Sequence, residues 1–243
     1  MLNNSLNNLT VLVTGGTRGI GCAIVEVFLD QGATVIYTGI KKEDPNKNNR
    51  AKYVQLDFCS DESVAQALET ILSHHRIDIL INNAGINIIE PIDQLKEEHW
   101  DRIFKVNLKG SAWLIKEFSR HMIDQGIKGK VLNISSIFGV VSRAKRASYS
   151  SSKSGILGLT RASALDLAPH QILVNALSPG FTDTELTREV LGEEGMRELA
   201  QQIPLKRCAD VKEIAHWALF LCSPHNSYIT GQNFVVDGGF IIQ

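Results

Sequence analysis

One stretch decides the fold of this 243-residue chain: Thr10-Val11-Leu12-Val13-Thr14-Gly15-Gly16-Thr17-Arg18-Gly19-Ile20-Gly21. It begins as a short β-branched run typical of a buried strand, and a helical pattern follows over 20–31. The glycines therefore lie where the backbone turns from a strand into the N-terminus of a helix. Unpaired amides and the positive end of the helix dipole bind phosphate at such a point without a lysine. The stretch predicts a site for the pyrophosphate of a dinucleotide, with Gly21 letting the helix pack close to the strand.

The rest of the chain continues this alternation of strand and helix. The short apolar runs have no polar face, which indicates a parallel sheet covered by helices on both sides. We therefore predict an α/β fold for residues 1–243: a single-domain Rossmann-type doubly wound parallel sheet of about seven strands with helices on both faces. The predicted strands are 10–14, 34–38, 52–56, 78–82, 130–135, 173–178 and 233–236, and the predicted helices are 20–31, 62–74, 100–122, 149–167 and 211–221.

Two irregular segments interrupt the alternation without dividing the chain. The polar run 41–50 predicts a loop that is too short to be a domain boundary. The region 184–207 mixes glycines with apolar residues, which predicts one or two short helices over a cleft. We expect this region to act as a mobile lid over the substrate.

Composition narrows the classes of partner. The 25 basic and 26 acidic residues leave a net charge of −1, so no overall field favours nucleic acid or an anionic membrane, and a small molecule is the expected partner. The N-terminal residues are polar and no later run is long enough to span a bilayer, so we expect a cytoplasmic protein that binds neither nucleic acid nor membrane. The four cysteines are scattered, which argues against a metal site and against a disulfide framework.

Tyr149 and Lys153 form the second informative pattern. Four residues apart in a predicted helix, they lie on one face, where an ammonium group can favour the ionised phenol. An unperturbed tyrosine has a pKa of about 10, too high for efficient proton transfer at neutral pH, so we expect the lysine to lower that pKa. Such a pair is more often structural, with the tyrosine packed along the lysine stem. Other residues are therefore needed to decide between a structural and a catalytic role.

The end of the second predicted strand bears on the choice of cofactor. A dinucleotide domain that prefers NAD usually carries Asp or Glu there, to bind the ribose hydroxyls. This chain has Thr38-Gly39-Ile40, with Arg18 and Lys41 nearby in sequence, so no carboxylate repels a 2′-phosphate and NADP is favoured over NAD. The alternative is that Lys41 and Lys42 are solvated loop charges.

Further motifs occur in the order and spacing of a known family. Over essentially its whole length the chain resembles the short-chain dehydrogenases/reductases, in particular a branch of 3-oxoacyl-[acyl-carrier-protein] reductases. The glycine-rich stretch opens the family pattern and the tyrosine–lysine pair lies at its centre. The remaining matches are Asp57, Asn82-Asn83-Ala84-Gly85, Asn107, Ser136, Pro179-Gly180 followed by Thr184, and Asp237-Gly238-Gly239.

The resemblance implies four catalytic residues. Ser136 orients the substrate oxygen and Tyr149 transfers a proton. Lys153 holds the nicotinamide ribose and lowers the tyrosine's pKa, while Asn107 binds a water that completes a proton relay. The chemistry agrees, because hydride transfer from an alcohol needs a base for the hydroxyl proton and the reverse reaction needs an acid. Ser136 has an alternative role as a strand-end cap and a neighbouring competitor in Ser135, and Asn107 could instead bond to its own helix backbone.

The resemblance also implies the cofactor contacts. Asp57 binds the adenine amino group, and Asn83, Ala84 and Gly85 hold the adenine-ribose side. The Thr182 backbone and the Thr184 side chain face the carboxamide and the phosphates. A homotetramer or homodimer is the family expectation. The complete predicted cofactor set is Gly15, Thr17, Arg18, Gly19, Ile20, Gly21, Thr38, Lys41, Asp57, Phe58, Asn83, Ala84, Gly85, Tyr149, Lys153, Pro179, Gly180, Thr182 and Thr184, and no metal is predicted.

The substrate is the least specified part. Arg143, Lys145 and Arg146 lie between the serine and the tyrosine, which suggests anionic substrates such as a sugar acid or an acyl group on a phosphopantetheine carrier. The alternative is a solvated basic loop or a subunit contact. We expect an NAD(P)-dependent oxidoreductase that acts on a ketone or secondary alcohol, with 3-oxoacyl thioester reduction leading and sugar, polyol or sugar-acid oxidation as the alternative. A non-catalytic NAD(P)-binding regulator, and an enzyme of epimerisation or dehydration, are the other candidates.

Overall fold

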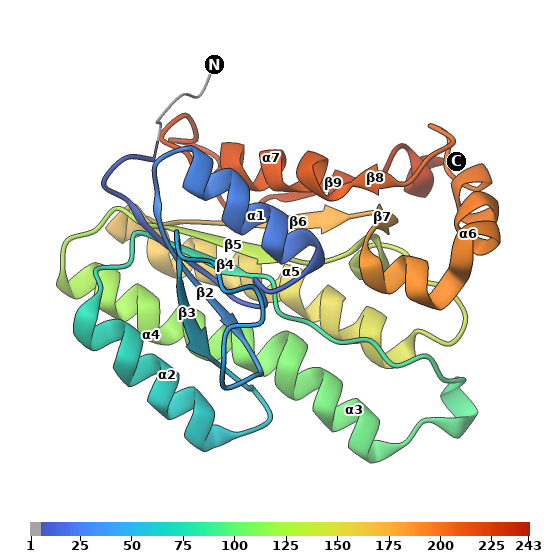
Figure 1. Ribbon diagram of the computed structural model, residues 1–243, viewed down its shortest axis with the longest axis horizontal. Helices are drawn as coiled ribbons and strands as arrows, with labels where there is room; N and C mark the ends of the chain where they lie inside the picture. Colours follow the sequence, from blue (N-terminus) through green and yellow to red (C-terminus); the bar gives the residue numbers. More distant parts are fainter. Residues whose placement is uncertain (1–5) are drawn as a thin grey trace.

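The computed structural model describes residues 6–243, apart from the side chains of Leu186 and Val190. The first five residues belong to the polar N-terminal segment in which the sequence predicts no targeting signal, and they lie outside the described residues. The described chain forms one α/β domain around a seven-stranded sheet (Figure 1). None of its helices combines the length and the apolar character that a membrane crossing requires.

All seven strands of the sheet are parallel, in the order β3-β2-β1-β4-β5-β6-β9. The order reverses at β1 and β4, so the chain winds outward from the centre in both directions, as predicted. In such a sheet ligands bind beyond the carboxyl ends of the strands. The strands are β1 (Thr10–Val13), β2 (Thr34–Gly39), β3 (Lys52–Gln55), β4 (Ile79–Asn82), β5 (Lys130–Ile134), β6 (Leu173–Pro179) and β9 (Asn233–Val236).

Helices cover the sheet on both faces (Figure 1). Successive side chains of a strand point to opposite faces, so Val11 and Val13 pack into one core and Leu12 into the other. The first core includes α1 (Gly19–Asp30) and α7 (Val211–Cys222), and the second includes α2 (Asp61–His74), α4 (Gly110–Asp124) and α5 (Ala147–Leu167). Burial of both faces explains why the strands lack a polar side.

The helix predicted over 100–122 is divided in the structure. It begins as α3 (Glu97–Phe104), passes through a π-helical segment, η2 (Lys105–Lys109), and continues as α4. A π-turn takes in an extra residue, and such turns occur often at functional sites. Here the wider turn carries Asn107, one of the predicted catalytic residues.

The region 184–207 is mainly helical, as predicted. Helix α6 (Glu185–Gln201) is broken at Gly192, whose φ of 63° and ψ of −178° lie outside the helical range. A two-stranded parallel sheet of β7 (Thr182–Asp183) and β8 (Ala209–Asp210), which the sequence did not predict, joins the two ends of the segment. Figure 1 shows α6 beyond the carboxyl end of β6. The single-turn helices are η1 (Ile92–Gln94), η3 (Ile137–Gly139), η4 (Ala168–His170) and η5 (Phe240–Ile242).

Candidate active site

The glycine-rich loop lies against the carboxyl end of β2. The Gly16 amide donates to the carbonyl oxygen of Thr38 (2.9 Å), and the Gly15 amide donates to the Thr38 hydroxyl (3.4 Å). A Cβ atom on Gly21 would lie 2.2 Å from the Gly15 carbonyl oxygen. Only glycine therefore allows the first turn of α1 to pack this close to the loop, as the sequence pattern predicted.

Asn83 and Ala84, which directly follow the neighbouring strand β4, brace this loop. The Asn83 side-chain amide donates to the carbonyl oxygens of Thr14 (2.9 Å) and Gly15 (3.0 Å). In return the Thr14 hydroxyl accepts from the backbone amides of Asn83 and Ala84, both at 3.0 Å. The carboxyl ends of β1 and β4 are thus tied together at the centre of the sheet, and Gly85 is exposed just beyond them.

A second helix N-terminus reaches the loop at Gly19. Gly19 has a φ of +55°, and a Cβ atom there would lie 3.5 Å from the Thr184 methyl group. Thr184 caps α6, with its hydroxyl accepting from the Thr187 amide at 3.1 Å. Two helix N-termini, both favourable to anions, therefore lie beside one loop. Among the other predicted cofactor residues near this loop, Thr17 and Ile20 are half-buried, and Arg18 and Lys41 are exposed.

Pro179 and Gly180 end β6 close to the C-terminal segment. A Cβ atom on Gly180 would lie 2.6 Å from the Asp237 Cα atom, so the turn requires glycine. The Thr182 hydroxyl donates to the Gly180 carbonyl oxygen at 3.1 Å. The Asp237 carboxylate accepts from the backbone amides of Gly239 and Ile241 at 2.9 and 2.8 Å. The predicted 179–184 contacts thus lie on a turn that is fixed at both ends.

Asp57 and Phe58 lie just beyond the carboxyl end of β3. One Asp57 carboxylate oxygen accepts from the Cys59 amide at 2.9 Å, and the carboxylate remains half-buried. The Phe58 ring fills the space that Gly110 leaves on α4, where a Cβ atom would lie 2.5 Å from the ring. The structure therefore places both residues on the same side of the sheet centre as the β2 end, where the sequence predicts the adenine.

Lys153 is the most deeply enclosed charge of the site, with 4% of its surface exposed. Its ammonium group donates to the carbonyl oxygen of Ile134 at 2.8 Å, which fixes it at the carboxyl end of β5. Removal of the group from water lowers its pKa to about 8. A Cβ atom on Gly85 would lie 3.4 Å from Lys153 Nζ, so the missing side chain leaves open the space above the ammonium group.

Tyr149 lies one helical turn before Lys153, as the spacing predicts. The lysine Nζ atom is 5.8 Å from the centre of the tyrosine ring. Burial raises the pKa of the phenol, and the hydrogen bond with Ser136 and the charge of Arg146 only partly offset this effect. The pKa of Tyr149 is therefore shifted upward, opposite to the expected lowering, because burial outweighs the hydrogen bond with Ser136 and the charge of Arg146.

The structure separates the two candidate serines. Ser135 donates to the carbonyl oxygen of Lys153 at 2.9 Å, inside the protein, so its hydroxyl holds α5 against β5. Ser136 accepts from the Phe138 amide at 3.1 Å and also meets the Tyr149 phenol. Ser136 thus fills the capping role that was its alternative and is also the serine beside the tyrosine.

Asn107 bonds outside its own helix, which excludes the alternative considered for it. Its side-chain oxygen accepts from the Ile86 amide (2.8 Å), and its amide group donates to the Ile86 carbonyl oxygen (2.9 Å) and to the Ser152 hydroxyl (3.0 Å). The residue is 1% exposed. The π-turn is therefore locked to the loop that follows β4 and to α5.

Ser152 is a site residue that the sequence analysis missed. Its hydroxyl donates to the Tyr149 carbonyl oxygen at 2.7 Å and accepts from Asn107, so it connects the π-turn to the helix of the tyrosine. The run of three serines between Tyr149 and Lys153 was a signal, because a serine on the buried face of a helix needs a partner; Ser152 is fully buried, whereas Ser151 is exposed.

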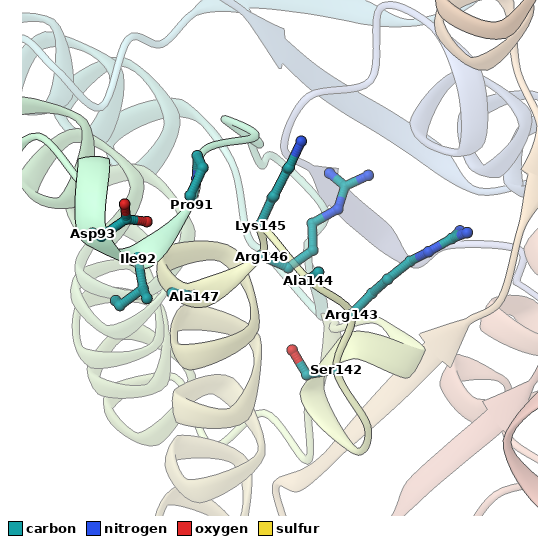
Figure 2. A pocket seen from close by; sticks show the side chains of 9 residues that line it. All are labelled: Pro91, Ile92, Asp93, Ser142, Arg143, Ala144, Lys145, Arg146 and Ala147. Atoms are coloured by element: carbon teal, nitrogen blue, oxygen red, sulfur yellow. The ribbon is translucent and has the colours of Figure 1, made fainter.

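A basic loop borders this site. A pocket of about 450 Å³ opens between the 91–93 segment and the N-terminus of α5 (Figure 2). Arg143, Lys145 and Arg146 all line it, and Asp93 is the one carboxylate among its lining residues. The three cations predicted at the substrate mouth therefore share one pocket.

The residues fit a nicotinamide dinucleotide. Two helix N-termini meet at the glycine-rich loop, and Gly85 leaves space beside a buried ammonium group that retains protons for another acceptor. Among residues 6–243 no group of three or more His, Cys, Asp or Glu side chains is arranged to hold a metal ion. The fold and the site thus define a nucleotide-dependent oxidoreductase.

Comparison with known proteins agrees, and the chain belongs to the short-chain dehydrogenase/reductase family. A family model described as Enoyl-(Acyl carrier protein) reductase matches residues 15–241. The 3-oxoacyl-[acyl-carrier-protein] reductase FabG of Aquifex aeolicus is 41% identical over 94% of this chain and 95% of its own length.

Two solved structures extend the similarity. A 4-hydroxyisoleucine dehydrogenase complexed with NADH aligns with a TM-score of 0.91 and 31% identity, over 97% of this chain and 100% of its own. A protein from Beutenbergia cavernae, provisionally named an NAD(P)-dependent gluconate 5-dehydrogenase and bound to NADP, aligns with a TM-score of 0.90 and 32% identity over 99% of both chains. The chain is therefore an NAD(P)-dependent oxidoreductase acting on an alcohol or carbonyl group.

Proposed function

We propose that this enzyme reduces 3-oxoacyl thioesters with NADPH and that Tyr149 is the proton donor. The observation that carries the reaction is the buried Lys153, held at 2.8 Å from the Ile134 carbonyl oxygen beside the phenol of Tyr149 and the hydroxyl of Ser136. The similarity to the FabG protein supports the thioester as substrate.

The proposed proton transfer uses the phenol directly. When bound, the nicotinamide cofactor supplies the hydride. Ser136 donates a hydrogen bond to the ketone oxygen, and Tyr149 gives that oxygen its proton as negative charge develops there. A phenol whose pKa is raised by burial stays protonated at neutral pH, which suits it to the reductive direction.

Lys153 and Asn107 would restore the proton. The ammonium group has a pKa of about 8, close enough to neutral pH for it to exchange protons with the phenol it serves. Asn107 already holds the Ile86 carbonyl oxygen with its amide group. A water on that carbonyl is the proposed continuation of the route toward solvent.

NADP is the proposed cofactor. The end of β2 carries no carboxylate: Thr38 is buried, with its hydroxyl accepting from the Gly15 amide, and Ile40 is exposed. Arg18 and Lys41 are exposed nearby, and neither forms an ion pair within residues 6–243. Both are free to bind a 2′-phosphate.

A second candidate function is oxidation of a sugar acid or polyol. The pocket lined by Arg143, Lys145 and Arg146 favours it, since a small anionic substrate would find three cations near the tyrosine. The similarity to the provisionally named gluconate 5-dehydrogenase points the same way.

We further propose a homotetramer or homodimer in the cytoplasm, with α6 as the lid. Large apolar side chains are exposed on three helices and a loop, which supports self-association: Trp113, Leu165, Trp217 and Tyr228. Four unpaired cysteines are compatible with a reducing compartment. The break at Gly192 gives α6 a point at which it can bend.

The test is a comparison of reductase substrates. NADPH and NADH oxidation is followed with acetoacetyl-N-acetylcysteamine, a neutral thioester, and with a ketose and a simple ketone as controls. The proposal expects kcat/KM to be greatest with NADPH and the thioester. Preference for the ketose would favour the second candidate function.

A further inference from the structure

Arg146 occupies a position next to the proposed proton donor. Its carbonyl oxygen accepts from the Ser150 amide at 2.7 Å, so the residue caps α5 three positions before Tyr149. Its guanidinium group lies 5.7 Å from the centre of the Phe138 ring. That ring in turn meets the Tyr149 ring edge-on, with centroids 6.5 Å apart. The Phe138 ring therefore lies next to both the guanidinium group and the ring of the reacting phenol.

The guanidinium group of Arg146 lacks a counter-charge. Its Nη1 atom is buried and makes no hydrogen bond, and no carboxylate of residues 6–243 forms an ion pair with it. Burial and the neighbouring Arg143 lower its pKa, whereas Tyr149 partly offsets this. An unpaired, partly buried charge is costly, and an anionic ligand would remove that cost.

The loop that carries the cations is fixed in place. The Lys145 carbonyl oxygen accepts from the Glu90 amide at 3.2 Å, and Lys145 adopts a left-handed φ of +66°. At the other end of the loop the hydroxyls of Ser142 and Ser150 lie 2.8 Å apart. The loop is thus tied both to the 86–91 segment and to α5. Its backbone is already ordered, so a ligand would lose little binding free energy by fixing it.

The charges around the pocket favour an anion. In Figure 2 the side chains of Arg143, Lys145 and Arg146 extend away from Asp93, which lies beside Ile92. Glu90, the other nearby carboxylate, has its Oε2 atom 2.9 Å from His99 Nδ1, and its Oε1 atom is buried without a hydrogen-bond partner. Three cations therefore line the pocket, and Asp93, the one carboxylate among its lining residues, stands apart from them.

We propose that Arg146 binds an anionic group of the substrate, a carboxylate or a phosphate, and thereby sets the specificity of the enzyme. Arg143 and Lys145 add positive charge at the pocket. The inference rests on the proposed function in one respect: it takes the bound molecule to be the substrate of the enzyme. The shared chemistry is an oxyanion with two oxygens free to accept from a guanidinium group.

The test measures binding of matched ligand pairs to the NADP-saturated enzyme by calorimetry. D-gluconate is compared with D-glucitol, and 4′-phosphopantetheine with pantetheine, because the members of each pair differ chiefly by the anionic group. For one pair at least, the anionic member is expected to bind about tenfold or more tightly than its neutral partner. Arg146→Gln should reduce that preference to about twofold. Arg161→Gln, which removes an exposed cation further along α5, should leave it unchanged.

The two pairs distinguish the sources of the anion. A preference for gluconate would assign a carboxylate near the reacting carbon, and a preference for phosphopantetheine would assign a carrier phosphate. Absence of preference in both pairs, or an undiminished preference in Arg146→Gln, would overturn the inference. A matching loss of kcat with the neutral acetoacetyl-N-acetylcysteamine in Arg146→Gln, without a change in anion preference, would show that Arg146 positions Tyr149 instead. Failure of the thioester assay alone would refute the proposed function and leave the anion site intact.

Discussion

The ammonium group of Lys153 is buried against the carbonyl oxygen of Ile134, at a distance of 2.8 Å. A lysine that served only to pack along a tyrosine would keep its charge in water. This one is enclosed at the carboxyl end of β5, where it loses hydration and gains a single backbone acceptor. The arrangement costs stability, and the proposed role in catalysis explains why the charge is buried.

Lys153→Met should reveal that cost through its pH dependence. The pKa of Lys153 falls from about 10.5 in an unfolded chain to about 8 in the folded protein. Between these values the unfolded state binds the additional proton, so the contribution of Lys153 to stability rises with pH. The difference in unfolding free energy between the variant and the parent should shrink by about 1 kcal/mol from pH 7 to pH 9. Urea denaturation at both pH values measures it, and a constant difference would mean that the lysine stays protonated in the fold up to pH 9, with a pKa that is not lowered.

Asn107→Ala should destabilise the protein as well as slow it. The substitution leaves the Ile86 amide and carbonyl groups without their side-chain partners and removes a donor to Ser152. The expected loss is about 1–3 kcal/mol, measured by denaturant unfolding. Ser111→Ala in the next turn, which removes only a long 3.4 Å bond to the Asn107 carbonyl oxygen, should cost less. Equal losses of unfolding free energy in the two variants would argue against the role of Asn107 as the link between η2 and the loop that follows β4.

Gly21→Ala should prevent the glycine-rich loop from forming. The added methyl group would lie 2.2 Å from the Gly15 carbonyl oxygen and 2.5 Å from the Asn83 side-chain amide. The affinity for NADPH, measured by fluorescence, should fall by at least about tenfold. The added methyl group meets a backbone oxygen, so the loop backbone itself would have to move. Gly158→Ala in α5 is the matched control, since nothing lies within 4 Å of its added atom. Its helix propensity should instead add up to about 1 kcal/mol of stability.

Arg18→Gln combined with Lys41→Gln tests the cofactor preference. Loss of two cations beside the proposed 2′-phosphate should raise KM for NADPH by about tenfold, and KM for NADH should remain nearly unchanged. Steady-state rates with both cofactors, alongside the remote surface variant Lys128→Gln, measure this. Equal effects on NADPH and NADH would mean that the two residues are solvated loop charges.

The sequence was sufficient for the sheet and for the position of the catalytic pair. Short continuous apolar runs such as Val11 to Val13 are typical of a strand buried on both faces, and the spacing of Tyr149 and Lys153 places both on one face of α5. These features depend on local periodicity, which a single sequence records.

Other features depend on contacts between distant segments. The π-turn at Asn107 exists because its side chain bonds to Ile86, 21 residues away, and no local pattern reports such a partner. The short sheet of β7 and β8 pairs Thr182 with Ala209 for the same reason. The pKa of Tyr149 was predicted in the wrong direction because burial, which the sequence does not quantify, outweighs the hydrogen bond with Ser136 and the charge of Arg146.

The central claim is that Tyr149 transfers the proton, and Tyr149→Phe tests it most directly. The measurement is kcat with NADPH and acetoacetyl-N-acetylcysteamine, together with the Kd for NADPH, in this variant and in Tyr228→Phe, a control at a side chain that is 95% exposed. The account predicts that Tyr149→Phe lowers kcat by about 10²–10⁴-fold and leaves the Kd for NADPH and the Tyr228→Phe enzyme nearly unchanged. A Tyr149→Phe enzyme that keeps the parent kcat would contradict the mechanism.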